Sequence, residues 1–143
     1  MLRKPRQRGP IAVYGATGYT GRLIAAELKA AGADFVLSGR NPEKLADLAE
    51  SLGDDAPTQA VSLDDDEGLR DLLSGCSTVI ACAGPFTLHG EPVLKAAVET
   101  GTHYLDTTGE QPFIRLAFEE YGPRAEAAGT VVIPAMGFDY MPG

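Results

Sequence analysis

The stretch Ile11-Ala12-Val13-Tyr14-Gly15-Ala16-Thr17-Gly18-Tyr19-Thr20-Gly21 decides the fold, because an apolar run leads directly into three glycines spaced by three residues. Gly15 permits a sharp turn at the end of a strand, Gly18 leaves room for backbone N–H groups to approach a phosphate, and Gly21 permits close packing of the next helix. The N-terminus of that helix offers unpaired amide donors and the positive end of its dipole to an anion. The stretch therefore predicts a strand, a tight turn and a helix that hold a dinucleotide pyrophosphate.

The spacing of these glycines, G-x-x-G-x-x-G, differs from the common G-x-G-x-x-G pattern, because Thr17 stands where that pattern has its middle glycine. The flanking sequence supports a ligand-binding turn, since a helical pattern with one apolar face follows and ends near Gly32. The alternative is a tight turn without a ligand. In the ligand-binding interpretation, the pyrophosphate is held by Gly15, Thr17, Gly18, Tyr19 and Thr20.

The composition is that of a soluble globular domain. The chain has 143 residues, of which 44% are hydrophobic, and this is enough for one domain with a core. It carries 20 acidic and 12 basic residues, and the formal net charge of −8 opposes binding to nucleic acid. No apolar run reaches the roughly twenty residues that span a bilayer, so we expect no transmembrane segment. Basic residues gather at the N-terminus, and we expect a flexible basic arm at 1–9 and one domain at 10–143.

Cysteines and histidines are too few for a disulfide framework or a metal site. Cys76 and Cys82 form no C-x-x-C motif, and we expect both to be reduced thiols in a cytoplasmic protein. His89 and His103 are the only histidines, and neither has a sequence pattern that marks a catalytic acid or base. The chain also lacks the G-x-S-x-G motif of a nucleophile elbow.

Strand and helix patterns alternate along the chain, which is typical of a parallel sheet covered on both faces by helices. Right-handed crossovers then give a doubly wound α/β Rossmann fold of three layers with about six strands. We expect strands at 11–14, 34–38, 58–62, 78–81, 103–106 and 130–133, and helices at 20–31, 42–52, 65–73, 91–100 and 112–128. Such sheets bind ligands at the carboxyl ends of their strands, so one crevice is expected to gather Gly15, 38–41, Leu63, 83–86 and 106–110.

The end of the second expected strand indicates which dinucleotide binds. An NAD site usually carries an acidic residue there, which accepts hydrogen bonds from the adenosine ribose. This chain has Ser38-Gly39-Arg40-Asn41 instead, without a carboxylate. Arg40 can meet a 2'-phosphate with paired, charge-assisted hydrogen bonds, and Lys44 lies one helical turn further on. The site is therefore predicted to bind NADP(H), with Arg40 and Asn41 at the 2'-phosphate. The alternative is that Arg40 is only an exposed charge at a strand end.

Two further loops follow expected strands. In Cys82-Ala83-Gly84-Pro85-Phe86, glycine permits close backbone approach and proline stiffens the loop. Its position predicts Gly84, Pro85 and Phe86 on the nicotinamide side, and the alternative is an ordinary turn from strand to helix. The polar segment Asp106-Thr107-Thr108-Gly109-Glu110 is placed to contact ribose or substrate, unless Asp106 caps the next turn instead.

Together these motifs resemble the saccharopine dehydrogenase-like oxidoreductases. The glycine turn by itself is common to many nucleotide-binding families. The combination of the Gly-Pro-Phe loop, the Tyr-x-Asp-x-x-Gly-Glu segment and the Gly-Phe-Asp turn is more specific. Beyond the basic arm, the chain looks like the N-terminal NADP-binding domain of that family. The resemblance rests on residues 15–21, 38–41, 83–86, 89–91, 96–110 and 137–139.

The resemblance implies an NADP-dependent oxidoreductase that transfers hydride between the nicotinamide and an imine, enoyl or carbonyl substrate. In that family a catalytic or substrate domain follows, whereas this chain stops just after the Gly-Phe-Asp turn. We therefore expect the domain that holds the small-molecule substrate to be absent, and the fragment to bind cofactor with little turnover. A separated domain of this kind is also expected to form homo-oligomers through the apolar surface left uncovered.

Two other functions stay open at this point. An extended short-chain reductase or epimerase shares the glycine spacing, but its chemistry needs a tyrosine followed four residues later by lysine, and no tyrosine here has one. A regulatory protein that senses NADP(H) without catalysis would bind the same cofactor and signal by a conformational change. Loss of hydride transfer with intact cofactor binding, in a full-length version, would favour the sensor.

Overall fold

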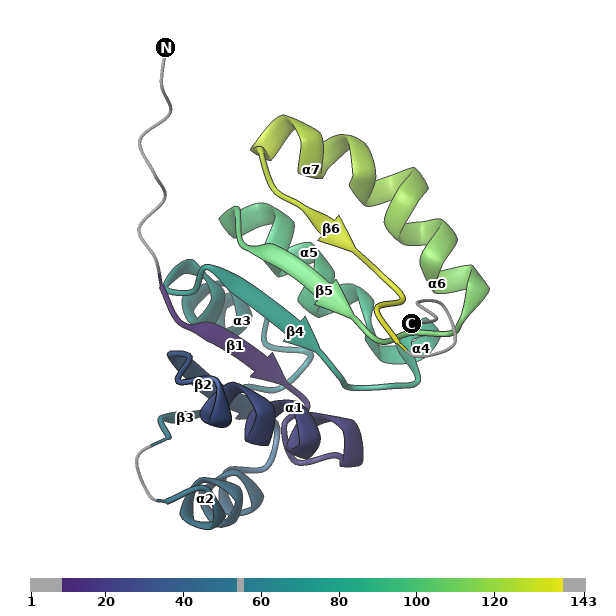
Figure 1. Cartoon of the computed structure of the whole chain (residues 1–143). Coiled ribbons are helices and arrows are strands. Elements are labelled where there is room, and N and C mark those ends of the chain that lie inside the picture. Colours follow the sequence, from purple (N-terminus) through teal and green to yellow (C-terminus); the bar gives the residue numbers. More distant parts are fainter. Residues whose placement is uncertain (1–8, 54–55, 138–143) are drawn as a thin grey trace.

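In the part of the chain that this computed structural model describes, residues 9–53 and 56–137, six parallel strands form one sheet in the order β3-β2-β1-β4-β5-β6 (Figure 1). The order changes direction at β1, which pairs with β2 on one side and with β4 on the other. Residues 1–8 of the expected arm and 138–139 of the Gly-Phe-Asp turn lie outside these ranges. The strands are β1 (Ile11–Tyr14), β2 (Phe35–Gly39), β3 (Thr58–Ala60), β4 (Thr78–Ala81), β5 (His103–Asp106) and β6 (Val132–Ile133).

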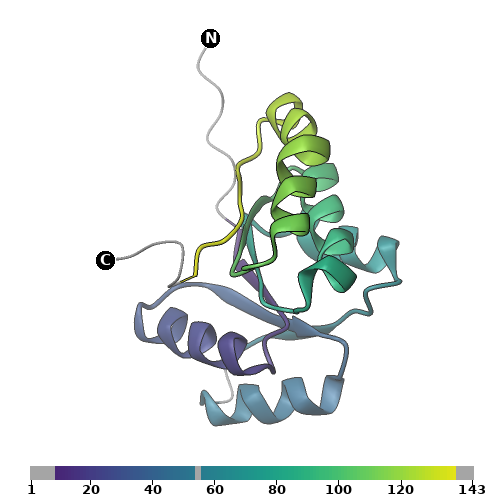
Figure 2. The same ribbon diagram turned by 90° about the vertical axis from the view of Figure 1, so that its right-hand side faces the viewer.

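Helices connect successive strands and cover both faces of the sheet. Figure 2 shows α1 and α5 on opposite sides of it. A short turn, α4, precedes α5, and a continuous helical rod made of α6, the π-helical turn η1 and α7 joins β5 to β6. The helices are α1 (Tyr19–Ala30), α2 (Pro42–Ser51), α3 (Asp66–Ser74), α4 (Phe86–His89), α5 (Glu91–Thr100), α6 (Gln111–Leu116), η1 (Ala117–Tyr121) and α7 (Gly122–Ala128).

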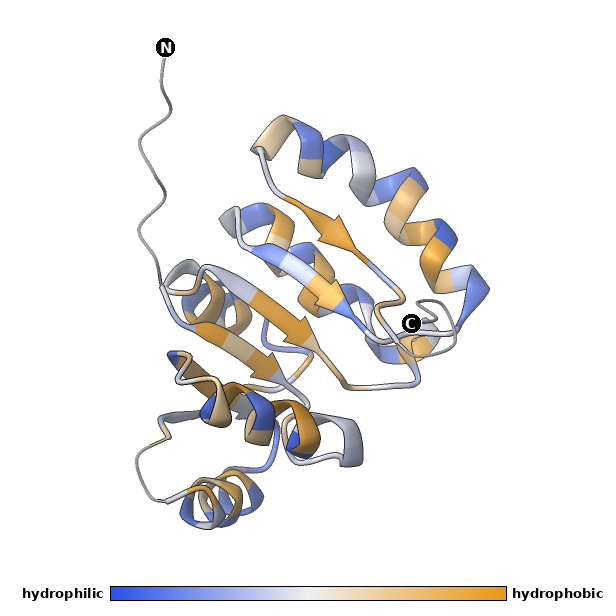
Figure 3. Cartoon of the chain, viewed as in Figure 1, coloured by the Kyte–Doolittle hydropathy of each residue, from blue (hydrophilic) through white to orange (hydrophobic). Residues whose placement is uncertain are grey.

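Alternation along the strands sends side chains into two apolar layers, one on each face of the sheet. Val13 belongs to the layer that contains Leu37 and Leu45 and is covered by α1 and α2. Its neighbour Ala12 belongs to the layer that contains Val79, which is covered by α3, α5 and the rod. Figure 3 shows β1, β4 and β6 as mostly hydrophobic, and helices of mixed character. The expected doubly wound, three-layer fold is confirmed.

Most element bounds agree with those expected from sequence, and the differences have local causes. The edge strands are shorter than expected, since β3 ends at Ala60 and β6 begins at Val132. In the part of the chain that the structure describes, each of them pairs with one neighbouring strand. The helix expected at 112–128 is interrupted by η1. Pro123 cannot donate a backbone hydrogen bond, and its ring would collide with the carbonyl of Glu119 in a regular α-helix. The α4 turn was not expected.

Candidate functional site

The glycine turn after β1 is enclosed by neighbouring backbone. Gly15 has a φ of +83°, and a Cβ there would lie 2.8 Å from the backbone nitrogen of Ala83 in the loop after β4. A Cβ at Gly21 would lie 2.7 Å from the Cα of Ala16. The amides of Gly15 and Ala16 donate to the carbonyl of Ser38 at 3.0 and 3.1 Å, which ties the turn to β2. The fold itself therefore requires glycine at positions 15 and 21.

Gly18 is different, because the protein leaves space beside it. Its φ of −76° is open to any residue, and a Cβ there would be 3.5 Å from the carbonyl oxygen of Gly15, which is an ordinary contact. As the N-cap of α1, Gly18 offers no side chain to the amides of the first turn, which lack partners within the helix. A side chain at this position would stand near those amides and obstruct an anion. The open space and the donors fit a pyrophosphate.

A cleft of about 420 Å³ opens at the carboxyl ends of β1, β2 and β4, where the order of the sheet changes direction. This volume lies in the range of small-molecule and cofactor sites. Its walls come from the glycine turn and from the loops after β2 and β4, and Leu63 lines it as expected. Arg40 also borders an adjoining hollow of about 490 Å³ at the start of α2. Six of the ten predicted contact residues line the cleft, namely Gly15, Thr17, Gly18, Arg40, Gly84 and Pro85.

The other four predicted contact residues have side chains outside the cleft. Tyr19 and Thr20 are exposed at the start of α1, the former to 83%. The side chain of Asn41 borders the adjoining hollow and caps α2, where it accepts a backbone hydrogen bond at 3.1 Å. Phe86 is buried, and its ring packs against a second phenylalanine with 5.5 Å between ring centroids. The ring of Phe86 therefore belongs to the core, and only its backbone is left to approach the nicotinamide, as predicted for this loop.

Asp106 is buried at the end of β5, and hydrogen bonds from the protein occupy its carboxylate. It accepts from the hydroxyl of Tyr104 at 2.7 Å and from the amides of Thr108 and Ala135 at 3.0 and 2.8 Å. Burial raises the pKa of Asp106, and these hydrogen bonds oppose that shift. The expectation that Asp106 contacts ribose or substrate is wrong for its side chain, because it joins the ends of β5 and β6. The alternative, a cap of the next turn, agrees with the bond from Thr108.

Glu110 likewise serves the protein rather than the cleft. Its carboxylate accepts hydrogen bonds from the amides of Phe86 and Thr87, the latter at 3.0 Å, and so caps the start of α4. Burial acts to raise the pKa of Glu110, but the hydrogen bonds from Thr87 and Phe86 outweigh it and lower that pKa. The segment 106–110 therefore does not line the crevice as expected, and instead holds the loop that does.

Three further residues line the cleft that sequence reasoning had not assigned to it: Tyr14, Cys82 and His89. The hydroxyl of Tyr14 donates to the carbonyl of Val61 at 2.7 Å, and burial raises its pKa to about 12, with Arg40 acting in the opposite direction. Burial also raises the pKa of the Cys82 thiol to about 12. His89 ends the α4 turn. The sequence could have indicated that His89 lies at the cleft, because it follows the Gly84–Pro85 loop by one helical turn.

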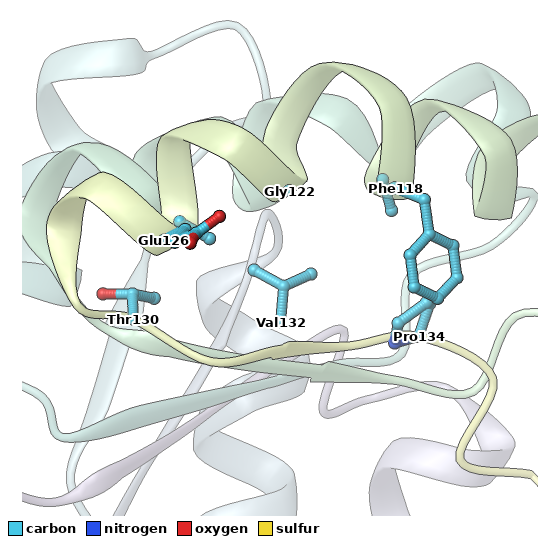
Figure 4. Close-up of a pocket in the computed structure, with 8 residues that line it drawn as sticks. Phe118, Gly122, Glu126, Thr130, Val132 and Pro134 are labelled. Atoms are coloured by element: carbon cyan, nitrogen blue, oxygen red, sulfur yellow. The ribbon is translucent and has the colours of Figure 1, made fainter.

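A separate hollow of about 230 Å³ lies at the outer edge of the sheet, between the helical rod and β6. Figure 4 shows Phe118 of the rod beside Pro134, and Val132 directed toward the helix near Gly122. Its lining is mostly apolar, and it shares no residue with the cleft. Within residues 9–53 and 56–137, no helix is long and apolar enough to cross a membrane. The same residues hold no group of three His, Cys, Asp or Glu that suits a metal ion.

The fold and the cleft together define a class of protein. A doubly wound parallel sheet whose central strand ends in a glycine turn, at the point where the strand order changes direction, is a dinucleotide-binding domain. The family model described as the saccharopine dehydrogenase NADP binding domain matches residues 11–133. The chain belongs to this family, as the sequence resemblance indicated, and its cofactor is NADP(H) as predicted.

Two curated relatives illustrate the range of the family. The trans-acting enoyl reductase of Mycobacterium leprae is 34% identical over 137 residues, which cover 92% of this chain and 33% of that protein. The lipid droplet localized protein of Caenorhabditis elegans is 32% identical over 146 residues, which cover 94% of this chain and 34% of that protein. The chain spans about a third of the length of these relatives. The first of these two relatives is a reductase by name.

Two solved structures share this fold. Saccharopine dehydrogenase (L-Glu forming) from Saccharomyces cerevisiae, in its apo form, superimposes with a TM-score of 0.72 at 24% identity, over 92% of this chain and 28% of that chain. The triphenylmethane reductase of a Citrobacter species, complexed with NADP(H), gives a TM-score of 0.66 at 26% identity, over 87% of this chain and 48% of that chain.

Proposed function

We propose that this chain is the cofactor domain of an enzyme that transfers hydride between NADPH and a small-molecule substrate with a C=N, C=C or C=O bond. The observation that carries the proposal is the order of groups along the cleft. Arg40 lies at the end of β2, the glycine turn at the end of β1, and the Gly84–Pro85 loop at the end of β4. That order matches the adenosine, pyrophosphate and nicotinamide parts of an extended dinucleotide.

In this proposal each part of the cleft has a binding or positioning task. Gly15, Thr17 and Gly18 hold the pyrophosphate against the first turn of α1, where the amides of Tyr19 and Thr20 also point. Arg40 binds the 2'-phosphate. Asn41 shapes that corner by capping α2. When bound, NADPH supplies the hydride, and the chain fixes the position of the ring from which it leaves.

The first experiment measures which dinucleotide the chain binds. Calorimetric titrations with NADPH and NADH should show a preference for NADPH. Arg40→Ala should weaken NADPH binding by about 10- to 100-fold, the usual worth of hydrogen bonds to a charged group, and leave NADH binding within about twofold. Arg115→Ala, which removes an exposed arginine on α6 paired with Glu119, is the matched control and should change neither. Equal loss for both dinucleotides in Arg40→Ala would overturn the assigned role of Arg40.

We also propose a role for the whole protein, by comparison with its longer curated relatives. Those relatives are about three times as long as this chain, so we propose that a further domain of the whole protein holds the substrate and completes catalysis. The name of the mycobacterial relative supports an enoyl substrate over an imine or a carbonyl. The chain alone is expected to bind NADPH but to oxidise it slowly.

We also propose a cytoplasmic location, supported by the free thiols of Cys76 and Cys82.

A further inference from the structure

His89 is the one imidazole that lines the cofactor cleft in the described part of the chain. It ends α4, the four-residue turn that follows the Gly84–Pro85 loop, and Figure 1 shows this turn beyond the carboxyl end of β4. Within the described residues the exposed side chain of His89 makes no hydrogen bond or ion pair. The imidazole is therefore available to a ligand in the cleft.

The strand order identifies the end of the cleft at which His89 lies. Arg40 comes from β2, on one side of the central strand β1, and marks the adenosine end. His89, Cys82 and Pro85 all come from the β4 side of β1, which is the opposite end. Because the pyrophosphate is held at β1 between them, the β4 end receives the nicotinamide half.

The nicotinamide ring carries one positive charge when oxidised and none when reduced. A cation beside the ring repels the oxidised form and has no such effect on the reduced form. Histidine is the side chain that gains or loses its charge near neutral pH. Two other groups in the cleft do not, because burial raises the pKa of Tyr14 and that of Cys82 to about 12. Both are uncharged at neutral pH.

The other charged groups around α4 are carboxylates and arginines, and they include the buried Asp106, whose charge acts on Cys82 and whose pKa burial raises. Glu110 accepts hydrogen bonds from the first amides of α4, which lower its pKa, and it stays ionised. Glu91, on α5 behind the turn, accepts a hydrogen bond from a tyrosine hydroxyl at 2.6 Å. Arg115 on α6 pairs with Glu119, and Arg40 lies at the far end of the cleft. Exposed carboxylates and guanidinium groups ordinarily titrate outside about pH 6 to 8, and a pH dependence that came from Asp106 would survive in His89→Gln.

We propose that His89 makes the cofactor site select between NADP+ and NADPH according to pH. Its protonated form disfavours NADP+, and its neutral form does not. The inference rests on the proposed NADP(H) site and concerns the ratio of two dissociation constants, Kd for NADP+ over Kd for NADPH. The phosphate charges are the same in both forms of the cofactor, so their titration cancels from this ratio. The ratio should fall by about fivefold from pH 6 to pH 8, as expected for two unit charges in a partly solvated cleft.

The test is calorimetry of the whole chain with NADP+ and with NADPH at both pH values. His89→Gln, which keeps a polar side chain without a titratable group, should give a ratio that does not change with pH. The matched control is His103→Gln. This second histidine lies at the opposite, amino end of β5, where its Nδ1 accepts from the amide of Val131 at 3.1 Å, and glutamine keeps an acceptor. His103→Gln should show the same pH dependence as the wild type.

A second readout comes from the same titrations repeated in buffers of different ionisation enthalpy, which count the protons released. Between pH 6 and pH 8, the wild type should release more protons on binding NADP+ than on binding NADPH, and His89→Gln should release equal numbers. A wild-type ratio that is constant with pH, or a pH-dependent ratio that survives in His89→Gln, would overturn the inference and leave the NADP(H) site intact. Failure of the wild type to bind either cofactor would instead overturn the proposed function, and the inference with it.

Discussion

Two buried threonines differ in whether their hydroxyl has a partner. Thr102 donates to the carbonyl of Leu73 at 2.7 Å, whereas Thr130 has no hydrogen-bond partner. Figure 4 shows the Thr130 hydroxyl turned away from Val132. Thr130→Val should therefore stabilise the domain by about 0.5–1 kcal/mol, because it removes an unpaired buried hydroxyl at constant shape. Thr102→Val, the matched control, should cost about 1–2 kcal/mol. Urea unfolding measures both. A loss of stability in Thr130→Val equal to that in Thr102→Val would contradict this account.

For single residues, the sequence predicted where the backbone requires glycine better than it predicted where side chains point. Gly15 and Gly21 could be assigned because each permits an approach that any Cβ would block. The ring of Phe86 could not be placed, since its partner in the core comes from α6, far along the chain. Asn41 was assigned to the 2'-phosphate, but its oxygen is used as a helix cap, a role that the Asn-Pro pair also indicates.

At the scale of elements, α4 depends on a carboxylate from another part of the chain. A four-residue turn is too short to be stable alone, and Glu110 satisfies its first amides. Because the pKa of Glu110 is lowered from 4.5 by folding, its contribution is present above that pH and is lost as pH falls through the folded value. Glu110→Gln should thus lower Tm at neutral pH, and the gap to the wild type should close below about pH 4.5. Glu119→Gln, which removes an exposed carboxylate of the rod, is the control and should change Tm little. An equal Tm for Glu110→Gln and the wild type at neutral pH would contradict the capping role.

The α4 turn is also a part of the site that could not be predicted from the sequence. Strands β1, β4 and β5 were predicted with their observed bounds, because apolar runs ended at clear turn residues. α4 has no periodicity to detect in four residues, so His89 was not assigned to the cleft that the loop before it helps to form. The polar segment at 106–110 looked like a site for the opposite reason. Polarity marks Asp106 and Glu110, but it does not distinguish a carboxylate bound by amides of the protein from one that faces a ligand.

At the scale of the molecule, β6 forms one edge of the sheet in the described part of the chain. Among residues 9–53 and 56–137, β5 is the one strand that pairs with β6. Four exposed apolar side chains lie on or near β6, and we call them the β6 edge patch: Phe118, Val131, Ile133 and Met136. Figure 3 shows the hydrophobic colour of β6 at this outer edge. Unpaired strands and apolar patches of this kind promote contact between chains. We therefore expect the isolated chain to self-associate reversibly as its concentration rises, as the sequence had suggested for a separated domain.

Sedimentation velocity over a wide range of concentrations tests this expectation. The sedimentation coefficient of the wild type should rise with concentration. Ile133→Lys should abolish the rise, because a charge on an edge strand opposes pairing with a second chain. Leu23→Lys is the control, since it adds the same charge to an exposed leucine on α1, which packs on the face of the sheet away from the rod. It should associate like the wild type. A wild-type coefficient that stays constant with concentration would mean that the β6 edge patch does not join two copies of this chain.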